Sequence, residues 1–296
     1  MRLRIAKKET AGGWRAVVIR IASVLVALLL SGLLMAAMGF DPIAAYAAIA
    51  KGSFGSARGL INTVTGATPP LIVALGLSIS FSMRFWNIGG EGQLIMGAIF
   101  ATFVAHRLPE STPAVVYWVS MALAAMLGGG VYALIPGLFR AYSGTNETLF
   151  TLMLNYVAIK VAVFLRLVLW KNPAAKGFPQ IKAIPEAAHL PKIFGIHIGW
   201  IIALVVTVFV AVYLKYTKRG YETRVVGESE RTAHYAGINV RHVLVGGVAL
   251  SGAIVGLAGF AKLSGVSHVL SESIGGGNGF SAVIVAWLAQ LNAPVM

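Results

Sequence analysis

The residues that could do chemistry lie in three polar stretches of an otherwise apolar chain, and the first is Phe85–Gln93 (FWNIGGEGQ). Three glycines within the four residues from Gly89 to Gly92 indicate a tight backbone approach or a broken helix. Non-helical backbone at membrane depth persists only where it is buried in protein or lines a wet cavity. Glu91 would lie in the first turn of the following helix, where the helix dipole favours an anion. The stretch indicates either a structural carboxylate or an element of a pathway or interface.

The second stretch, Ser143–Thr148 (SGTNET), precedes an apolar helix over 149–170. Ser143 or Thr145 can cap this helix, and Glu147 falls in its first turn. At 100° per residue one narrow sector of the helix holds only small and polar residues, with Glu147 at its edge: Thr148, Thr151, Asn155, Ala158 and Ala162. In lipid such a face meets protein or water, so it predicts either helix packing or a pore lining. Lys160 lies on another side of the helix.

The third stretch is the polar segment 215–242, in which Gly227 and Gly237 bracket nine residues of helix-forming character. Glu228 or Ser229 can begin a short helix there, and Gly237 can end it in the left-handed conformation. An isolated helix of this length is marginal in water, so a partner surface would have to hold it. The alternative is an ordinary solvated loop.

Composition excludes several classes of protein. The chain is 57% hydrophobic and 11% charged, which is far from the composition of a soluble enzyme. It contains no cysteine, and its six histidines show no metal-ligand spacing, so we expect neither a metal site nor a catalytic residue. Gly275–Gly279 lacks the lysine of a phosphate-binding loop and is interpreted as a turn before the last helix.

Long apolar runs predict an all-α, polytopic membrane bundle with seven crossings and an eighth that is incomplete or only just complete. The expected spans are 21–40, 59–83, 92–105, 111–139, 145–170, 193–214, 243–261 and 273–296. We therefore expect a basic N-terminal segment, 1–20, followed by a single transmembrane domain, 21–296, with the polar loop 215–242, and a chain that is incomplete at its C-terminus. Glycines within 243–261, including Gly252 and Gly256, indicate close helix packing.

The basic residues predict the orientation. Segments 1–20 and 215–242, together with Arg84 and Arg140, place fourteen Lys and Arg residues on one side of these spans, against seven on the other. The positive-inside rule then puts the N-terminus in the cytoplasm. The net charge of +14 is thus interpreted as a membrane-surface property, with no nucleic acid as partner.

The three stretches together resemble the permease subunit of ABC importers of the nucleoside and simple-sugar type, which are related to the ribose and branched-chain amino-acid permeases. The similar words are FWNIGGEGQLIMGA (85–98), GTNETLFTLMLNYVA (144–158) and RVVGESERTAHYAGINV (224–240), with GFSAVIVAWL (279–288) as a weaker fourth. The resemblance implies a multi-pass protein of a bacterial-type plasma membrane that moves its cargo by alternating access.

The resemblance also implies the partners. Such a permease pairs with a second permease subunit, identical or different, binds two cytoplasmic ATPase subunits, and receives cargo from an extracytoplasmic substrate-binding lipoprotein. No cofactor is expected in this chain, since ATP would bind to the partner ATPases. The implied coupling element comprises Gly227, Glu228, Arg231, Tyr235, Ala236 and Gly237.

Cargo of this kind needs amide partners and an aromatic face. The candidate substrate-path residues are therefore Trp86, Asn87, Glu91, Gln93, Glu147 and Asn155, with Tyr156 as a further aromatic group. A secondary, ion-coupled carrier is the alternative, because Glu91 and Glu147 could serve as proton sites. A membrane enzyme would need paired acids, a histidine cluster or a nucleophile near the bilayer, and the sequence shows none.

Overall fold

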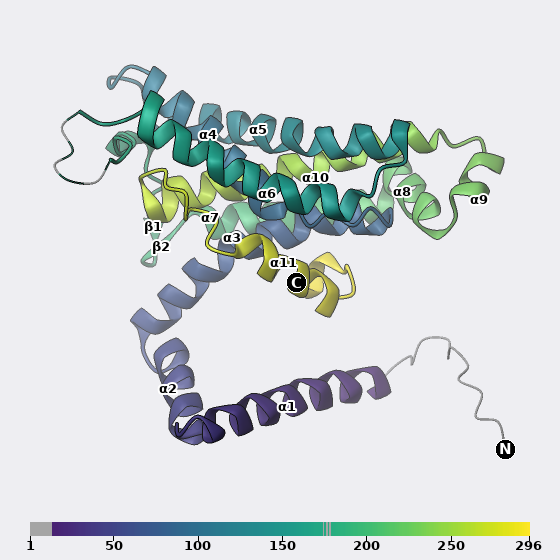
Figure 1. Cartoon of the computed structure of the whole chain (residues 1–296), viewed down its shortest axis with the longest axis horizontal. Helices are drawn as coiled ribbons and strands as arrows, with labels where there is room; N and C mark the ends of the chain where they lie inside the picture. The colour runs from purple at the N-terminus through teal and green to yellow at the C-terminus, as the bar shows by residue number, and fades with distance from the viewer. Residues whose placement is uncertain (1–13, 174, 176, 178) are drawn as a thin grey trace. The chain divides into compact units, whose positions relative to one another are not determined.

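The computed structural model describes residues 14–173, 175, 177 and 179–296, and it is helical almost throughout (Figure 1). The long helices are α1 (Trp14–Ala37), α3 (Ala57–Ser82), α4 (Gly90–Arg107), α5 (Ala114–Ser143), α6 (Glu147–Phe164), α7 (Gly199–Tyr216) and α10 (Val240–Lys262). The shorter helices are α2 (Pro42–Phe54), α8 (Lys218–Glu228), α9 (Glu230–Tyr235) and α11 (Asn278–Leu288). A two-residue hairpin joins β1 (Lys192–Ile193) to β2 (Ile196–His197). The remaining elements are π-helical turns at Leu165–Leu169 and Leu263–Ser267 and 3-10 turns at Glu186–Ala188 and Ala293–Val295.

The all-α polytopic class is confirmed. Five described helices are long and apolar enough to cross a membrane: 57–82, 114–143, 147–169, 199–216 and 240–267. Ile21–Ala37 and Asn278–Leu288 are shorter apolar helices, and α4 is less apolar because it carries Glu91, Gln93 and Arg107. The predicted total of seven to eight crossings stays a prediction.

The residues form two compact units, Met1–Thr63 and Val64–Met296. In the first unit, Asp41 caps α2 by accepting hydrogen bonds from the amides of Ile43 and Ala44. The Tyr46 hydroxyl donates to the Leu28 carbonyl oxygen at 2.7 Å, which ties α2 to α1. The predicted basic segment 1–20 lies largely outside the described residues, which begin at Trp14.

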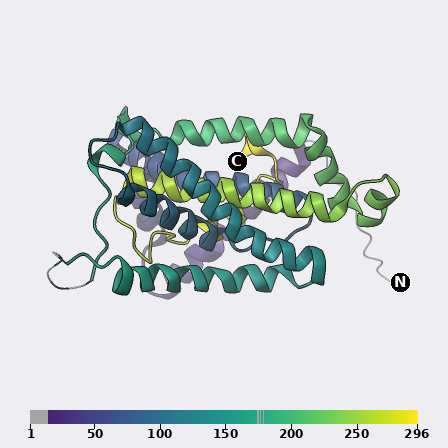
Figure 2. The same cartoon turned by 90° about the horizontal axis from the view of Figure 1, so that it is seen from above.

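The second unit is built around α10, which packs most extensively against α5 and also against α4. Seen from above, α10 runs through the middle of this unit, with α7 along one side and α6 along the other (Figure 2). Small residues allow the close approach that the glycines predicted. A Cβ on Gly256 would collide with the carbonyl oxygen of Ala125, and one on Gly129 would collide with that of Gly252. The backbones of α5 and α10 are therefore in direct contact.

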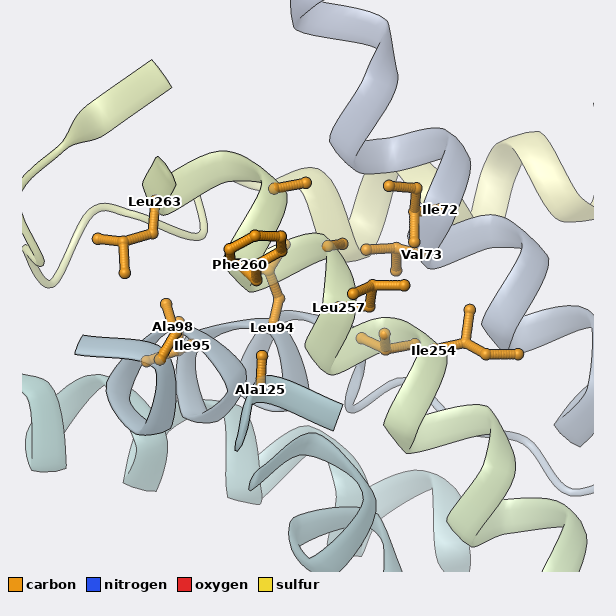
Figure 3. Close-up of a cluster of buried hydrophobic side chains, with 14 of the residues drawn as sticks. Ile72, Val73, Leu94, Ile95, Ala98, Ala125, Ile254, Leu257, Phe260 and Leu263 are labelled. Atoms are coloured by element: carbon orange, nitrogen blue, oxygen red, sulfur yellow. The ribbon is translucent and has the colours of Figure 1, made fainter. Parts of the chain in front are cut away.

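The apolar core lies between α3, α4, α5 and α10 (Figure 3). Ile72 and Val73 from α3 and Leu94 from α4 are completely buried there, and Phe260 from α10 is almost so. This packing fixes the start of α4 against the neighbouring helices, and it is at the start of α4 that the polar residues gather.

The two ends of the second unit differ. At one end, which we call the α9 end, lie α8, α9 and the loop after α3; at the opposite end, the hairpin end, lie β1 and β2 (Figure 1). At the hairpin end the rings of His189 and His268 stack with their centroids 3.8 Å apart. Burial lowers the pKa of His197 and His268. Stacked and buried imidazole rings thus contribute to the packing at this end.

Candidate functional site

The segment between α3 and α4 is a non-helical backbone that α6 holds in place. Asn155 of α6 accepts a hydrogen bond from the amide of Gly92 at 2.8 Å and donates to the carbonyl oxygen of Ile88 at 2.9 Å. One turn away, the Thr151 hydroxyl accepts from the amide of Ile88 at 3.1 Å. Side chains of α6 therefore satisfy backbone groups that a broken helix leaves free, which is the condition for irregular backbone inside a membrane.

Two amide side chains close the same segment on itself. Asn87 is completely buried and Gln93 is almost so. The Gln93 amide donates to the Asn87 oxygen at 3.0 Å, and the Asn87 amide donates to the Gln93 oxygen at 3.3 Å. The Asn87 oxygen also accepts from the amide of Gly89 at 3.0 Å. Both side chains therefore form their hydrogen bonds within this segment of the protein.

Glu91 joins the start of α4 to the start of α11. The residue is buried, with an exposed fraction of 5%. One oxygen accepts from the amide of Gly277 at 2.8 Å and the other from the amide of Gly279 at 2.7 Å. Charge-assisted bonds of this kind are about twice as strong as neutral ones. We call this arrangement the Glu91 clamp.

Lys262, the last residue of α10, binds the same loop through a backbone carbonyl group. Its ammonium donates to the carbonyl oxygen of Gly275 at 3.1 Å. The loop Gly275–Gly279 is therefore bound through two amides by a carboxylate and through one carbonyl by an ammonium. It is a fixed joint between α4, α10 and α11.

The predicted substrate-path residues thus fall into three places. Asn87, Glu91, Gln93 and Asn155 come together, and the polar stripe of α6 faces α4, so it is a packing face in this structure. Trp86 lies apart and is 44% exposed, stacked on Trp287 of α11 with centroids 5.1 Å apart. Whether cargo contacts any of the six stays a prediction.

Glu147 is at the α9 end, where it belongs to an ion network. Arg140, in the last turn of α5, contacts Glu147 at 3.5 Å and Glu230 of α9 at 4.0 Å. Glu147 is buried to an exposed fraction of 8%, whereas the Glu230 side chain is 61% exposed. Arg140 therefore connects α9 with the end of α5 and the start of α6.

The predicted short helix is present as α9, and the helix α8 directly precedes it. Ser229 ends α8 and caps α9, accepting from the amide of Thr232 at 3.2 Å, and Gly237 is left-handed with φ +75° as predicted. Gly227 does not mark the start of the short helix, because it is buried in the last turn of α8 beside the carbonyl of Ser82. Five of the six predicted coupling residues are exposed: Glu228, Arg231, Tyr235, Ala236 and Gly237.

Buried residues anchor this exposed segment to the transmembrane helices. Val226 of α8 and Ala233 of α9 belong to a small apolar cluster with Met83 and Phe85, which border the broken segment, and Val240 at the start of α10. Tyr235, in contrast, is 92% exposed. An aromatic side chain that is presented in this way on an anchored helix is typical of a protein interface.

Comparison with known proteins decides what kind of protein carries these features. The sequence profile of the family described as the permease component of the branched-chain amino acid transport system matches residues 59–295. The chain belongs to this permease family.

Curated relatives agree with this family, and their similarity extends over nearly the whole chain. The chain is 30% identical to the glucose ABC transporter permease protein TsgB13 of Haloferax volcanii, over 98% of this chain and 79% of the relative. It is 28% identical to the nucleoside ABC transporter permease protein NupB of Lactococcus lactis subsp. cremoris, over 95% and 80%. It is 27% identical to the guanosine ABC transporter permease protein NupP of Bacillus subtilis, over 90% and 77%. No solved structure matches the chain with significance.

The permease is therefore a multi-pass protein of the cell membrane and a non-enzymatic transport subunit of the ABC class. Sequence reasoning missed two of the residues that organise it. Arg140 was counted only as a positive charge, although an arginine at the end of a long uncharged helix, just before Glu147, was a signal for an ion pair. Lys262 and its loop offered no such signal, because the partners lie far apart in the sequence.

Proposed function

We propose that this permease imports nucleosides or simple sugars, using ATP that partner ATPase subunits hydrolyse. The names of the relatives, which transport glucose, nucleosides and guanosine, support this cargo class. The proposal includes a second permease subunit, identical or different, and an extracytoplasmic binding lipoprotein. The chain itself would hold no cofactor, and its N-terminus would be cytoplasmic, together with the α9 end.

The observation that carries the proposal is the exposed α9 segment with its buried anchor. Ala233 is completely buried in the cluster that contains Met83 and Phe85, while Tyr235 two residues later is 92% exposed. A partner that pushed on Tyr235 would therefore push on the broken segment before α4. Arg140 offers a second route, from Glu230 to the start of α6. Both routes end at the region that contains Asn155 and Glu91.

The hairpin end offers a surface for the lipoprotein. Arg107 lies over the ring of Phe103 at 4.9 Å, and Trp170 stacks on the same ring at 6.3 Å. These residues line a hollow of about 430 Å³ together with Lys171 and Lys182. A basic and aromatic surface of this kind suits an acidic partner protein.

Uptake by the reconstituted transporter tests the proposed function. We expect labelled guanosine or glucose to enter proteoliposomes that contain the permease, its ATPases, its sister subunit and the lipoprotein only when ATP is supplied on the cytoplasmic side. Dissipating the proton gradient should leave this uptake unchanged. Uptake that persists without ATP and stops with the proton gradient would instead establish an ion-coupled carrier.

Replacing Gly237 with valine should uncouple the transporter. Gly237 has φ +75°, a conformation that a β-branched residue adopts only with strain, so the turn after α9 should change shape. We expect uptake to fall by about tenfold or more while the ATPases continue to hydrolyse ATP, since strain of this kind costs about 1–3 kcal/mol. Uptake per ATP hydrolysed is the measurement.

Gly246→Val is the matched control, because Gly246 has ordinary helical geometry and no atom lies within 4 Å of the position its Cβ would take. Wild-type uptake per ATP in Gly237→Val would show that the turn does not transmit motion.

A further inference from the structure

Lys160 is a charged side chain near the middle of a membrane-crossing helix. It is exposed, and it lies about 20 Å from the start of α6 at Glu147 and about 14 Å from the end of the π-helical turn at Leu169. Side chains of a helix lean toward its N-terminus, so the ammonium points back along α6 and away from the nearer boundary. It cannot easily reach the headgroups on the hairpin side.

A second cation of this membrane-crossing segment lies in the π-helical turn that follows α6. Arg166 forms an ion pair with Glu272 at 2.9 Å. Among the residues that the structure describes, Lys160 makes no hydrogen bond or ion pair. Charged groups inside a membrane face a bundle interior or water rather than hydrocarbon.

The surroundings of Lys160 show what kind of partner fits. It lies about 140° around α6 from Asn155, on the side away from α4. There it lies on an open and otherwise largely apolar face of α6, beside Tyr156, Val157, Val161 and Phe164. Tyr156, one helical turn before Lys160 in the sequence, is 63% exposed.

We propose that Tyr156 and Lys160 line the water-filled path and contact the cargo there. An ammonium offers three donors and no acceptor, which suits the hydroxyl groups of a ribose or a hexose. A tyrosine ring provides an apolar face on which a sugar ring or a base packs, with a polar tip at its edge. The amides of Asn87 and Gln93, in contrast, already bond to each other. This proposal rests on the proposed function and assigns the cargo contact to the other side of α6.

The absence of cysteine from the chain makes a labelling experiment direct. We expect Lys160→Cys, in the assembled transporter, to react with a charged, membrane-impermeant thiol reagent, detected as a mass increase of this chain. Guanosine or glucose at about ten times its half-saturating concentration should slow the reaction about tenfold, because only about a tenth of the sites stay free. Leu123→Cys on α5 is the matched control and should stay unlabelled, because Leu123 is an apolar residue that is 61% exposed.

A second variant tests the contact without a label. Lys160→Met retains most of the side chain and removes the three donors, so the half-saturating cargo concentration should rise about ten- to hundredfold. Failure of Lys160→Cys to react, or a reaction that cargo does not slow, overturns the inference, as does wild-type uptake by Lys160→Met. If the wild-type transporter showed no ATP-driven uptake, the proposed function itself would have failed.

Discussion

Replacing Glu91 with glutamine should reduce uptake by about thirtyfold, although the side chain keeps its size. Each Glu91 oxygen accepts a backbone amide of the loop before α11, at 2.8 Å from Gly277 and 2.7 Å from Gly279. Glutamine has one oxygen, so one buried amide would face an NH₂ group. An unsatisfied buried donor costs about 1–3 kcal/mol, and a loss of about 2 kcal/mol changes an equilibrium about thirtyfold.

The measurement is initial uptake rate in proteoliposomes, with the amount of permease in the membrane held equal. Glu110→Gln makes the same chemical change on the surface, where the Glu110 side chain is 87% exposed and 3.9 Å from Lys182, so it should have little effect. Wild-type uptake by Glu91→Gln would mean that the clamp does not position α11.

Replacing Gly256 with valine should prevent the permease from folding. The Cβ would meet the carbonyl oxygen of Ala125, and Cα of Gly129 lies 3.0 Å from the same point. Both obstacles are backbone, so a side-chain rotation cannot relieve the clash, and α5 and α10 would have to separate. Substitutions of this kind belong to the rare class that costs more than about 4 kcal/mol.

The yield of monodisperse permease in mild detergent measures this effect. Gly246→Val is again the control, because it places the same side chain on the same helix where no atom lies within 4 Å. We expect near wild-type yield from Gly246→Val and almost none from Gly256→Val. Equal yields would show that α5 and α10 do not cross as described.

The sequence predicted much of the fold because hydrophobic length is a local property. Five of the expected spans are confirmed as long apolar helices. The broken segment before α4 was predicted from its glycines, and the capping of α9 by Ser229 from residue types. Two helices were missed. Helix α2 begins at a proline after Asp41, and α8 has the mixed polar composition of a loop.

The arrangement around Glu91 could be predicted only in part. Its place in the first turn of a helix followed from local spacing, whereas its partners Gly277 and Gly279 are 186 and 188 residues away. The sequence therefore showed Gly275–Gly279 only as a turn. The polar stripe of α6 was identified, but periodicity cannot distinguish a face toward α4 from a face toward water.

Crosslinking at position 235 tests the central claim, that α9 transmits the action of an ATPase to the transmembrane helices. Tyr235 is 92% exposed and the chain has no cysteine, so Tyr235→Cys provides a single reactive site. A short thiol-to-amine crosslinker added to membranes of the native host should join this chain to an ATP-binding subunit, with a yield that changes when ATP is bound. A site that captures no ATP-binding subunit, and that instead reacts with an impermeant reagent outside intact cells, would contradict the account.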